Sequence, residues 1–125
     1  MKIALAAAAL ALVGLTQVTH ASAEEDWARH LEVSATSKGG TVRIVAEGND
    51  GWFVNTQFPF KLTLEGADKP ELGKSDARLE GEKDGKAKRA VFEAKADGKV
   101  EGTYKIVVCS ATACSPPLKG SFASN

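Results

Sequence analysis

The two cysteines of this 125-residue chain lie close together near its C-terminus. Cys109 and Cys114 are separated by Ser-Ala-Thr-Ala, and Pro116 and Pro117 follow them. Such a pair can form a structural disulfide, act as a redox-active dithiol, or contribute to a metal clip. A structural zinc site needs four nitrogen or sulfur ligands, and outside an apolar leader the chain adds only His30 to the two cysteines. We therefore expect no metal site and no cofactor.

The N-terminus has the three regions of a secretory signal peptide. Lys2 supplies a positive charge, residues 3–15 are almost entirely apolar, and residues 21–23 (Ala-Ser-Ala) are the small residues that a signal peptidase recognises. The apolar core is shorter than the roughly 20 residues that a transmembrane helix needs. We predict a signal peptide over residues 1–23, export to the periplasm or the extracellular space, and one domain over residues 24–125 with no membrane segment.

The charge balance excludes some partners. Without Lys2, residues 24–125 carry 15 basic and 16 acidic residues. A nearly neutral domain lacks the basic footprint that binds nucleic acid or anionic lipid, so we expect neither as a partner. The locally basic stretch over residues 83–89 is interleaved with acidic residues and a glycine, which is typical of a solvated turn.

Motifs for other catalytic chemistry are absent from the sequence. Gly73-Lys74-Ser75 resembles the end of a phosphate-binding loop, but the first glycine of that loop would fall at Asp68. There is no GxSxG motif, and a single histidine such as His30 needs an orienting partner before it can act as a base. The sequence carries no hydrolase or metalloenzyme signature.

Short alternating runs separated by turns predict an all-β domain. The runs over residues 30–36, 41–47, 60–64, 88–95 and 102–109 place apolar side chains at a period of two, with turn signals at residues 48–51 and 97–98. We predict an immunoglobulin-like antiparallel β-sandwich of about seven or eight strands. The expected core contains Phe53, Phe60, Leu62, Leu64, Phe92, Tyr104, Ile106 and Val108.

In an exported chain the two cysteines are expected to bond to each other. Closing so short a loop stabilises the fold by only about 2 kcal/mol, and short or exposed disulfides tend to be reducible. Such reducibility is compatible with a redox role, but the spacing alone favours a local structural disulfide. With Val108 facing the core, alternation predicts that Cys109 points outward at the mouth of a hairpin between the last two strands. Pro116 and Pro117 cannot donate backbone hydrogen bonds and should hold that loop open.

Three motifs resemble the N-terminal periplasmic domain of the thiol:disulfide interchange protein DsbD. They are Asp50-Gly51-Trp52-Phe53, Glu71-Leu72-Gly73-Lys74-Ser75-Asp76, and the segment from Cys109 to Pro117. Their order and rough spacing agree over most of residues 30–123, as in a stand-alone, divergent copy. Four residues lie between the cysteines where that family usually has five, and Leu72 replaces an aromatic residue.

The resemblance implies disulfide shuttling with a protein redox partner. Cys109 and Cys114 would be the redox pair, which accepts electrons from a membrane-embedded partner domain and passes them to oxidised proteins. The segment from Glu71 to Asp76 would be a cap that shields the pair. The alternative is a non-catalytic exported binding module with a structural disulfide, for which the sequence names no ligand.

Overall fold

The computed structural model describes residues 26–124. The predicted signal peptide and its cleavage site lie outside these residues. Within the described part of the chain, no helix has the length and apolarity needed to cross a bilayer. Residues 26–28 form a helical turn shortly before the first strand.

Ten β-strands and one short 3-10 helix follow that turn in the described residues. They are β1 (Leu31–Lys38), β2 (Thr41–Gly48), β3 (Phe53–Asn55), β4 (Lys61–Ala67), β5 (Glu71–Gly73), η1 (Lys74–Asp76), β6 (Ala77–Glu80), β7 (Lys86–Ala87), β8 (Arg89–Ile106), β9 (Val108–Cys109) and β10 (Leu118–Ala123). The all-β class is confirmed. The strands outnumber the seven or eight expected because β3, β5, β7 and β9 have only two or three residues each, too few to show a periodic pattern.

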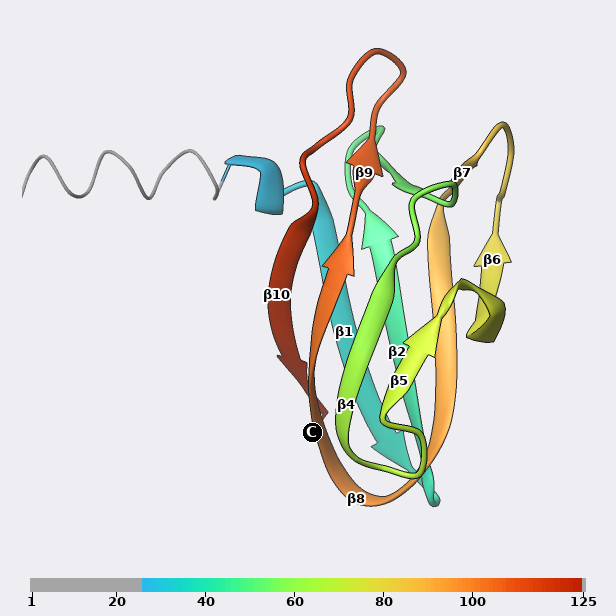
Figure 1. The fold of residues 1–125 in the computed structure, drawn as a ribbon, viewed down its shortest axis with the longest axis vertical. Coiled ribbons are helices and arrows are strands. Elements are labelled where there is room, and N and C mark those ends of the chain that lie inside the picture. Colours follow the sequence, from blue (N-terminus) through green and yellow to red (C-terminus); the bar gives the residue numbers. More distant parts are fainter. Residues whose placement is uncertain (1–25, 125) are drawn as a thin grey trace, which may run out of the picture.

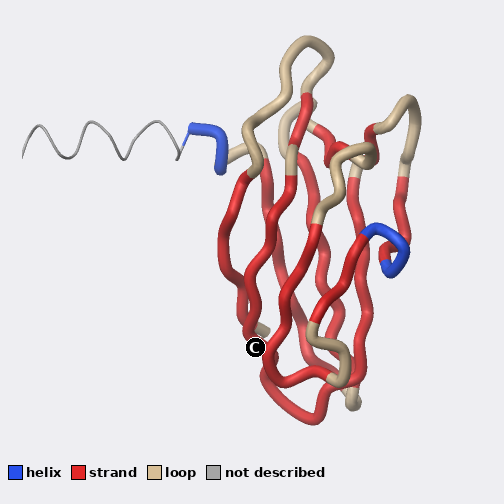
Figure 2. The backbone as a smooth tube through the Cα atoms, in the orientation of Figure 1, coloured by secondary structure: helices blue, strands red, loops and turns tan. Residues whose placement is uncertain are grey.

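The strands form two antiparallel layers that share β8 (Figure 1). One layer has the order β1-β2-β8-β6 and the other has β10-β8-β4-β5. The first half of β8 pairs with β2 through residues 89–95, and its second half pairs with β4 and β10 through residues 101–106. Figure 2 shows the strand running without a break around the bend between these halves, at the predicted Asp97-Gly98 turn.

The core lies between the two layers, where alternating strands turn their apolar side chains inward. Six of the eight predicted core residues are buried: Phe60, Leu62, Leu64, Phe92, Ile106 and Val108. Phe60 and Phe92 meet edge to face, with ring centroids 5.9 Å apart. Tyr104 is half-buried and packs against this core, whereas Phe53 is half-buried and does not belong to it, so its predicted place in the core is wrong.

A separate sheet of three short strands, in the order β7-β3-β9, closes one end of the sandwich. Its strands come from distant parts of the chain, since Val54 of β3 pairs with Ala87 on one side and with Val108 on the other. All three of these residues are buried, so they form the inner face of this small sheet. The cysteine hairpin leaves the molecule from its β9 edge (Figure 1).

Candidate functional site

Cys109 and Cys114 form a disulfide within the hairpin that joins β9 to β10. Their Cα atoms are 4.0 Å apart, and the two residues form an antiparallel bridge. The predicted bond and its place between the last two strands are therefore confirmed. The redox role of the pair stays a prediction.

Backbone hydrogen bonds on both sides of the disulfide hold the hairpin closed. The Ser115 N–H donates to the Val108 carbonyl at 2.8 Å, and the Ser110 N–H donates to the Ala113 carbonyl at 2.7 Å. The Ser110 hydroxyl also accepts hydrogen bonds from the N–H groups of Thr112 and Ala113, at 3.3 and 3.2 Å. The loop is a tight turn, and the prediction that it is held open is wrong.

Ser115 explains how pairing continues up to the double proline. Its side chain is buried, and its hydroxyl accepts a hydrogen bond from the Val108 N–H at 3.1 Å. A side chain of the return arm thus supplies the acceptor for a backbone donor of β9. Regular pairing stops at Pro116 and Pro117, which are exposed, and it resumes at Leu118 in β10.

The two bonded cysteines differ in their access to solvent. Cys114 is exposed, whereas Cys109 is only 1% exposed. The expectation that Cys109 is open to a partner is therefore wrong. Val108 does face the core as predicted, but the outward-pointing Cys109 is covered as well, and its cross-strand neighbour on that face is Phe53 of β3. An incoming thiol can reach the disulfide from the Cys114 side.

Phe53 and Lys86 share a face with the disulfide. Phe53 lies directly opposite Cys109 in the register of β3 and β9, and Asn55 lies opposite Lys86 in the register of β3 and β7. Opposed residues of an antiparallel pair point to the same side, and residues two apart on a strand do too. Phe53, Lys86 and Cys109 therefore lie on the outer face of the small sheet.

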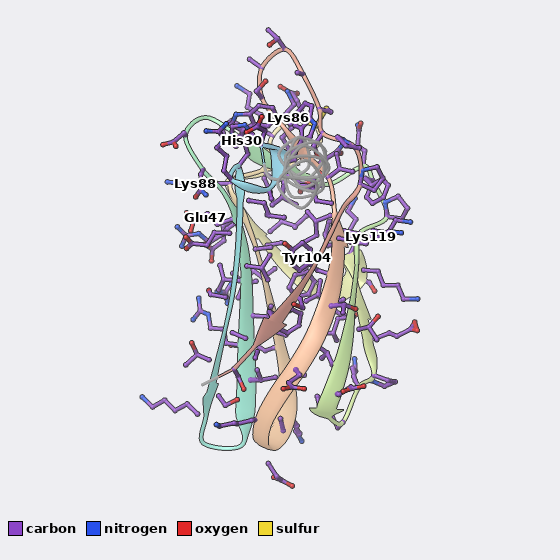
Figure 3. All side chains as sticks on the ribbon, turned by 90° about the vertical axis from the view of Figure 1, so that its left-hand side faces the viewer. His30, Glu47, Lys86, Lys88, Tyr104 and Lys119 are labelled. Atoms are coloured by element: carbon purple, nitrogen blue, oxygen red, sulfur yellow. A yellow bond between two sulfur atoms is a disulfide. The ribbon has the colours of Figure 1, made fainter. Side chains whose placement is uncertain are left out.

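Lys86 connects this face to the hairpin. Its ammonium donates a hydrogen bond to the Ser110 carbonyl at 3.1 Å, and Ser110 directly follows Cys109. Figure 3 places Lys86 at the end of the sandwich that carries the hairpin. Lys83 and Asp84 line, together with Phe53, Gly81 and Lys86, a hollow of about 350 Å³.

The turn before Lys86 has the backbone of a tight hairpin. Asp84 and Gly85 both have positive φ, 55° and 78°. Lys83 and Lys86 exchange two backbone hydrogen bonds, of 2.7 and 3.1 Å, which is the pattern of a two-residue type I′ turn. The Thr56 N–H donates to the Gly85 carbonyl at 2.8 Å, which fastens the turn to the end of β3.

The predicted cap segment, Glu71 to Asp76, forms β5 and η1 on the flank of the sandwich, away from the projecting hairpin (Figure 1). Leu72 is buried opposite Leu62. The Asp76 carboxylate accepts a hydrogen bond from the Gly73 N–H at 2.9 Å and pairs with Lys69 at 3.3 Å. These two interactions, the backbone hydrogen bond first, lower the pKa of Asp76.

The remaining cap residues, Lys74 and Ser75, are exposed. Its described hydrogen bonds lie within the segment or join it to Lys69 and β4, and none of them reaches Cys109 or Cys114. Its role as a shield stays a prediction. The side chains that the register brings to the outer face beside Cys109 are Phe53 and Lys86. Sequence reasoning missed their role because the pairing of β3 with β7 and β9 leaves no periodic signal.

An aromatic cluster lies beside the start of the sandwich. The His30 ring stacks on Trp52 with centroids 4.1 Å apart, and Trp27 meets Trp52 edge to face at 5.8 Å. A neighbouring groove of about 480 Å³ is lined by Trp27, Ala28, Tyr104, Pro116, Pro117, Leu118 and Lys119. Burial raises the pKa of Tyr104.

Within residues 26–124, no three His, Cys, Asp or Glu side chains gather in a way that could hold a metal ion.

No model of a known protein family matches the chain, and no curated protein matches it in sequence. Among solved structures, it is similar to the N-terminal domain of DsbD from Neisseria meningitidis in its reduced form, with 13% identity, a TM-score of 0.39, and coverage of 78% of this chain and 93% of that one. It is also similar to ACE19, the collagen-binding subdomain of the Enterococcus faecalis surface protein ACE, with 9% identity, a TM-score of 0.37, and coverage of 77% and 96%. With identities and TM-scores this low, neither similarity indicates a function for this chain.

Proposed function

We propose that this domain carries out thiol–disulfide exchange through Cys109 and Cys114, with a protein dithiol as its redox partner, in an oxidising compartment outside the cytoplasm. The observation that carries the proposal is the unequal exposure of the two sulfur-bearing residues. An exchange disulfide needs one sulfur that an incoming thiolate can reach. Cys114 meets that requirement, and the covered Cys109 is then the leaving group.

The exchange would proceed in two steps. A thiolate of the partner attacks Sγ of Cys114, so that a partner–Cys114 disulfide forms, the Cys109–Cys114 bond breaks, and Cys109 leaves as a thiolate. The partner's second thiolate then attacks the partner's own sulfur in the mixed disulfide and releases the Cys114 thiolate. The partner loses two electrons and becomes a disulfide, and this domain gains two electrons and, after uptake of protons, two thiols.

Hydrogen bonds hold the hairpin closed in addition to the covalent bond. Two backbone hydrogen bonds flank the cysteines, the Ser110 hydroxyl caps the turn, and Ser115 fastens the return arm to Val108. The closed loop is short, so the bond restricts the unfolded chain by only about 2 kcal/mol. A hairpin that keeps its shape in both redox states is suited to repeated exchange.

The reduction potential of the pair tests this function. Equilibration of the purified domain with glutathione buffers, read by mass spectrometry after alkylation, should give a potential in the range of known oxidoreductases. A value below about −300 mV would mark an inert structural bond and would overturn the proposal.

A non-catalytic exported binding module is the second candidate. The groove beside Trp27, Tyr104 and Pro117 supports it, because hollows lined by aromatic and apolar side chains are the usual sites for apolar ligand groups. An apolar fluorescent probe titrated into the variant with both cysteines replaced by alanine separates the two candidates. Binding that survives in this variant belongs to the groove and not to the disulfide.

A further inference from the structure

Lys86 has a contact that a solvated turn does not explain. Its side chain comes from β7, crosses the outer face of the small sheet, and donates to the Ser110 carbonyl at 3.1 Å. It is half-buried, although its neighbours Lys83 and Lys88 are exposed. Among the ion pairs of residues 26–124, none includes Lys86. The described structure thus leaves its positive charge unmatched next to the residue that follows Cys109.

We propose that Lys86 is a positioning residue for disulfide exchange, which stabilises the Cys109 thiolate when the disulfide opens. This inference rests on the proposed function. Attack at the exposed Cys114 releases the negative charge on Cys109, whose residue is 1% exposed. Burial disfavours a thiolate, because the charge loses its hydration. A cation beside the sulfur offsets that loss and lowers the pKa of the thiol.

The register places Lys86 where it can do this. Lys86 and Cys109 occupy the same face of the small sheet, on either side of β3. The bond to the Ser110 carbonyl uses one of the three donors of the ammonium. The other two remain for the sulfur once it carries a charge. The carbonyl therefore holds the lysine in place before the reaction begins.

Other charged groups near this face are few among the described residues. Lys83 and Asp84 line the hollow beside Phe53, and both belong to the turn that precedes Lys86. Asp84 opposes the effect of Lys86 and Lys83 adds to it. Arg89 is engaged elsewhere, since its guanidinium pairs with Glu47 at 3.2 Å and with Glu80 at 3.3 Å. Lys86 is the cation with a bond to the hairpin.

The test isolates the Cys109 thiol in the Cys114→Ala variant and follows its thiolate absorbance against pH. Adding Lys86→Gln should raise the pKa of Cys109, because glutamine keeps a hydrogen-bond donor and removes the charge. Lys86→Arg should restore it. In the domain with both cysteines, Lys86→Gln should slow disulfide opening by dithiothreitol several-fold, because a leaving thiol of higher pKa leaves more slowly.

Lys99→Gln is the matched control, since Lys99 is exposed and lies at the bend of β8, away from the hairpin. It makes the same change in net charge and should leave the thiol pKa and the opening rate as they are. An equal pKa and rate in the Lys86→Gln and parent proteins would overturn the inference and leave Lys86 with a structural role. If Lys86→Gln unfolds, the pKa of Cys109 in the Cys114→Ala variant is measured at low and at high salt instead. Salt that screens the charge of Lys86 should raise this pKa. A pKa that does not change with salt would overturn the inference.

These readouts are separate from the proposed function. A domain without physiological exchange would still show a Cys109 pKa that depends on Lys86. If the domain exchanges disulfides without help from Lys86, its reduction potential lies in the oxidoreductase range. The pKa of Cys109 is then the same in all Lys86 variants.

Discussion

Phe53 and Cys109 are directly opposed in the register between β3 and β9, and they share the outer face of the small sheet. This pairing brings an aromatic ring beside a cysteine that lies 56 positions later in the chain. Cys109 is 1% exposed, while Cys114, to which it is bonded, is exposed. The disulfide is thus open to attack from one side.

Phe53→Ala should make the disulfide easier to open. Removing the ring uncovers Cys109 and gives a thiol a second sulfur to attack. Opening by dithiothreitol, followed by mass spectrometry after alkylation, should be several-fold faster than in the parent. Phe53→Leu keeps much of the cover and is the matched control. Equal rates in all three proteins would show that Phe53 does not shield the bond.

Ser115→Ala should destabilise the fold. The substitution leaves the buried Val108 N–H without its side-chain acceptor, and an unsatisfied buried donor costs about 1–3 kcal/mol. Urea denaturation of the oxidised protein measures this cost. Ser121→Ala, at an exposed position of β10, should change the free energy of unfolding by less than about 0.5 kcal/mol. Similar costs for both variants would count against the Ser115–Val108 bond.

Much of the sandwich could be predicted from the sequence, because its long strands alternate. The runs that became β1, β2, β4 and both halves of β8 showed a period of two, and most of their inward residues are buried. The Asp97-Gly98 signal marked the bend, although the strand continues through it. Pairing of long strands with one buried face leaves a clear pattern in the sequence.

The surroundings of the disulfide could not be predicted in the same way. The alternation of side chains along a strand predicted correctly that Val108 faces the core. Alternation does not say what covers the outward-facing Cys109. Cys109 is buried although it points away from the core, its cross-strand neighbour Phe53 belongs to β3, and Lys86 arrives from β7. Each of these strands is two or three residues long, so their contacts are set by tertiary structure and not by a local pattern.

Replacing both cysteines by alanine should leave the fold intact. The hydrogen bonds of Ser110 and Ser115 still close the hairpin, and the lost loop constraint is worth about 2 kcal/mol. Circular dichroism should show an unchanged β spectrum, and urea denaturation should show the loss. A variant that fails to fold would mean that the bond is essential to the structure.

Asp76 should make the free energy of unfolding depend on pH in the acidic range. Its pKa is lowered in the folded state by the Gly73 N–H and by Lys69. The stabilisation is therefore present above the ordinary carboxyl pKa of about 3.9 and is lost as the pH falls through the lower folded value. Asp76→Asn should remove this contribution, so that its unfolding free energy differs from the parent's at pH 7 and converges with it in acid. An equal difference at both pH values would contradict the assignment.

Trapping of a mixed disulfide tests the exchange function most directly. Single-cysteine variants would be produced in an oxidising compartment and analysed by non-reducing mass spectrometry. Cys109→Ala, which keeps the exposed Cys114, should carry a covalently bound protein partner that dithiothreitol releases. Cys114→Ala, which keeps the covered Cys109, should carry far less. Absence of a bound partner from both variants would contradict the exchange account and leave the disulfide as a structural staple.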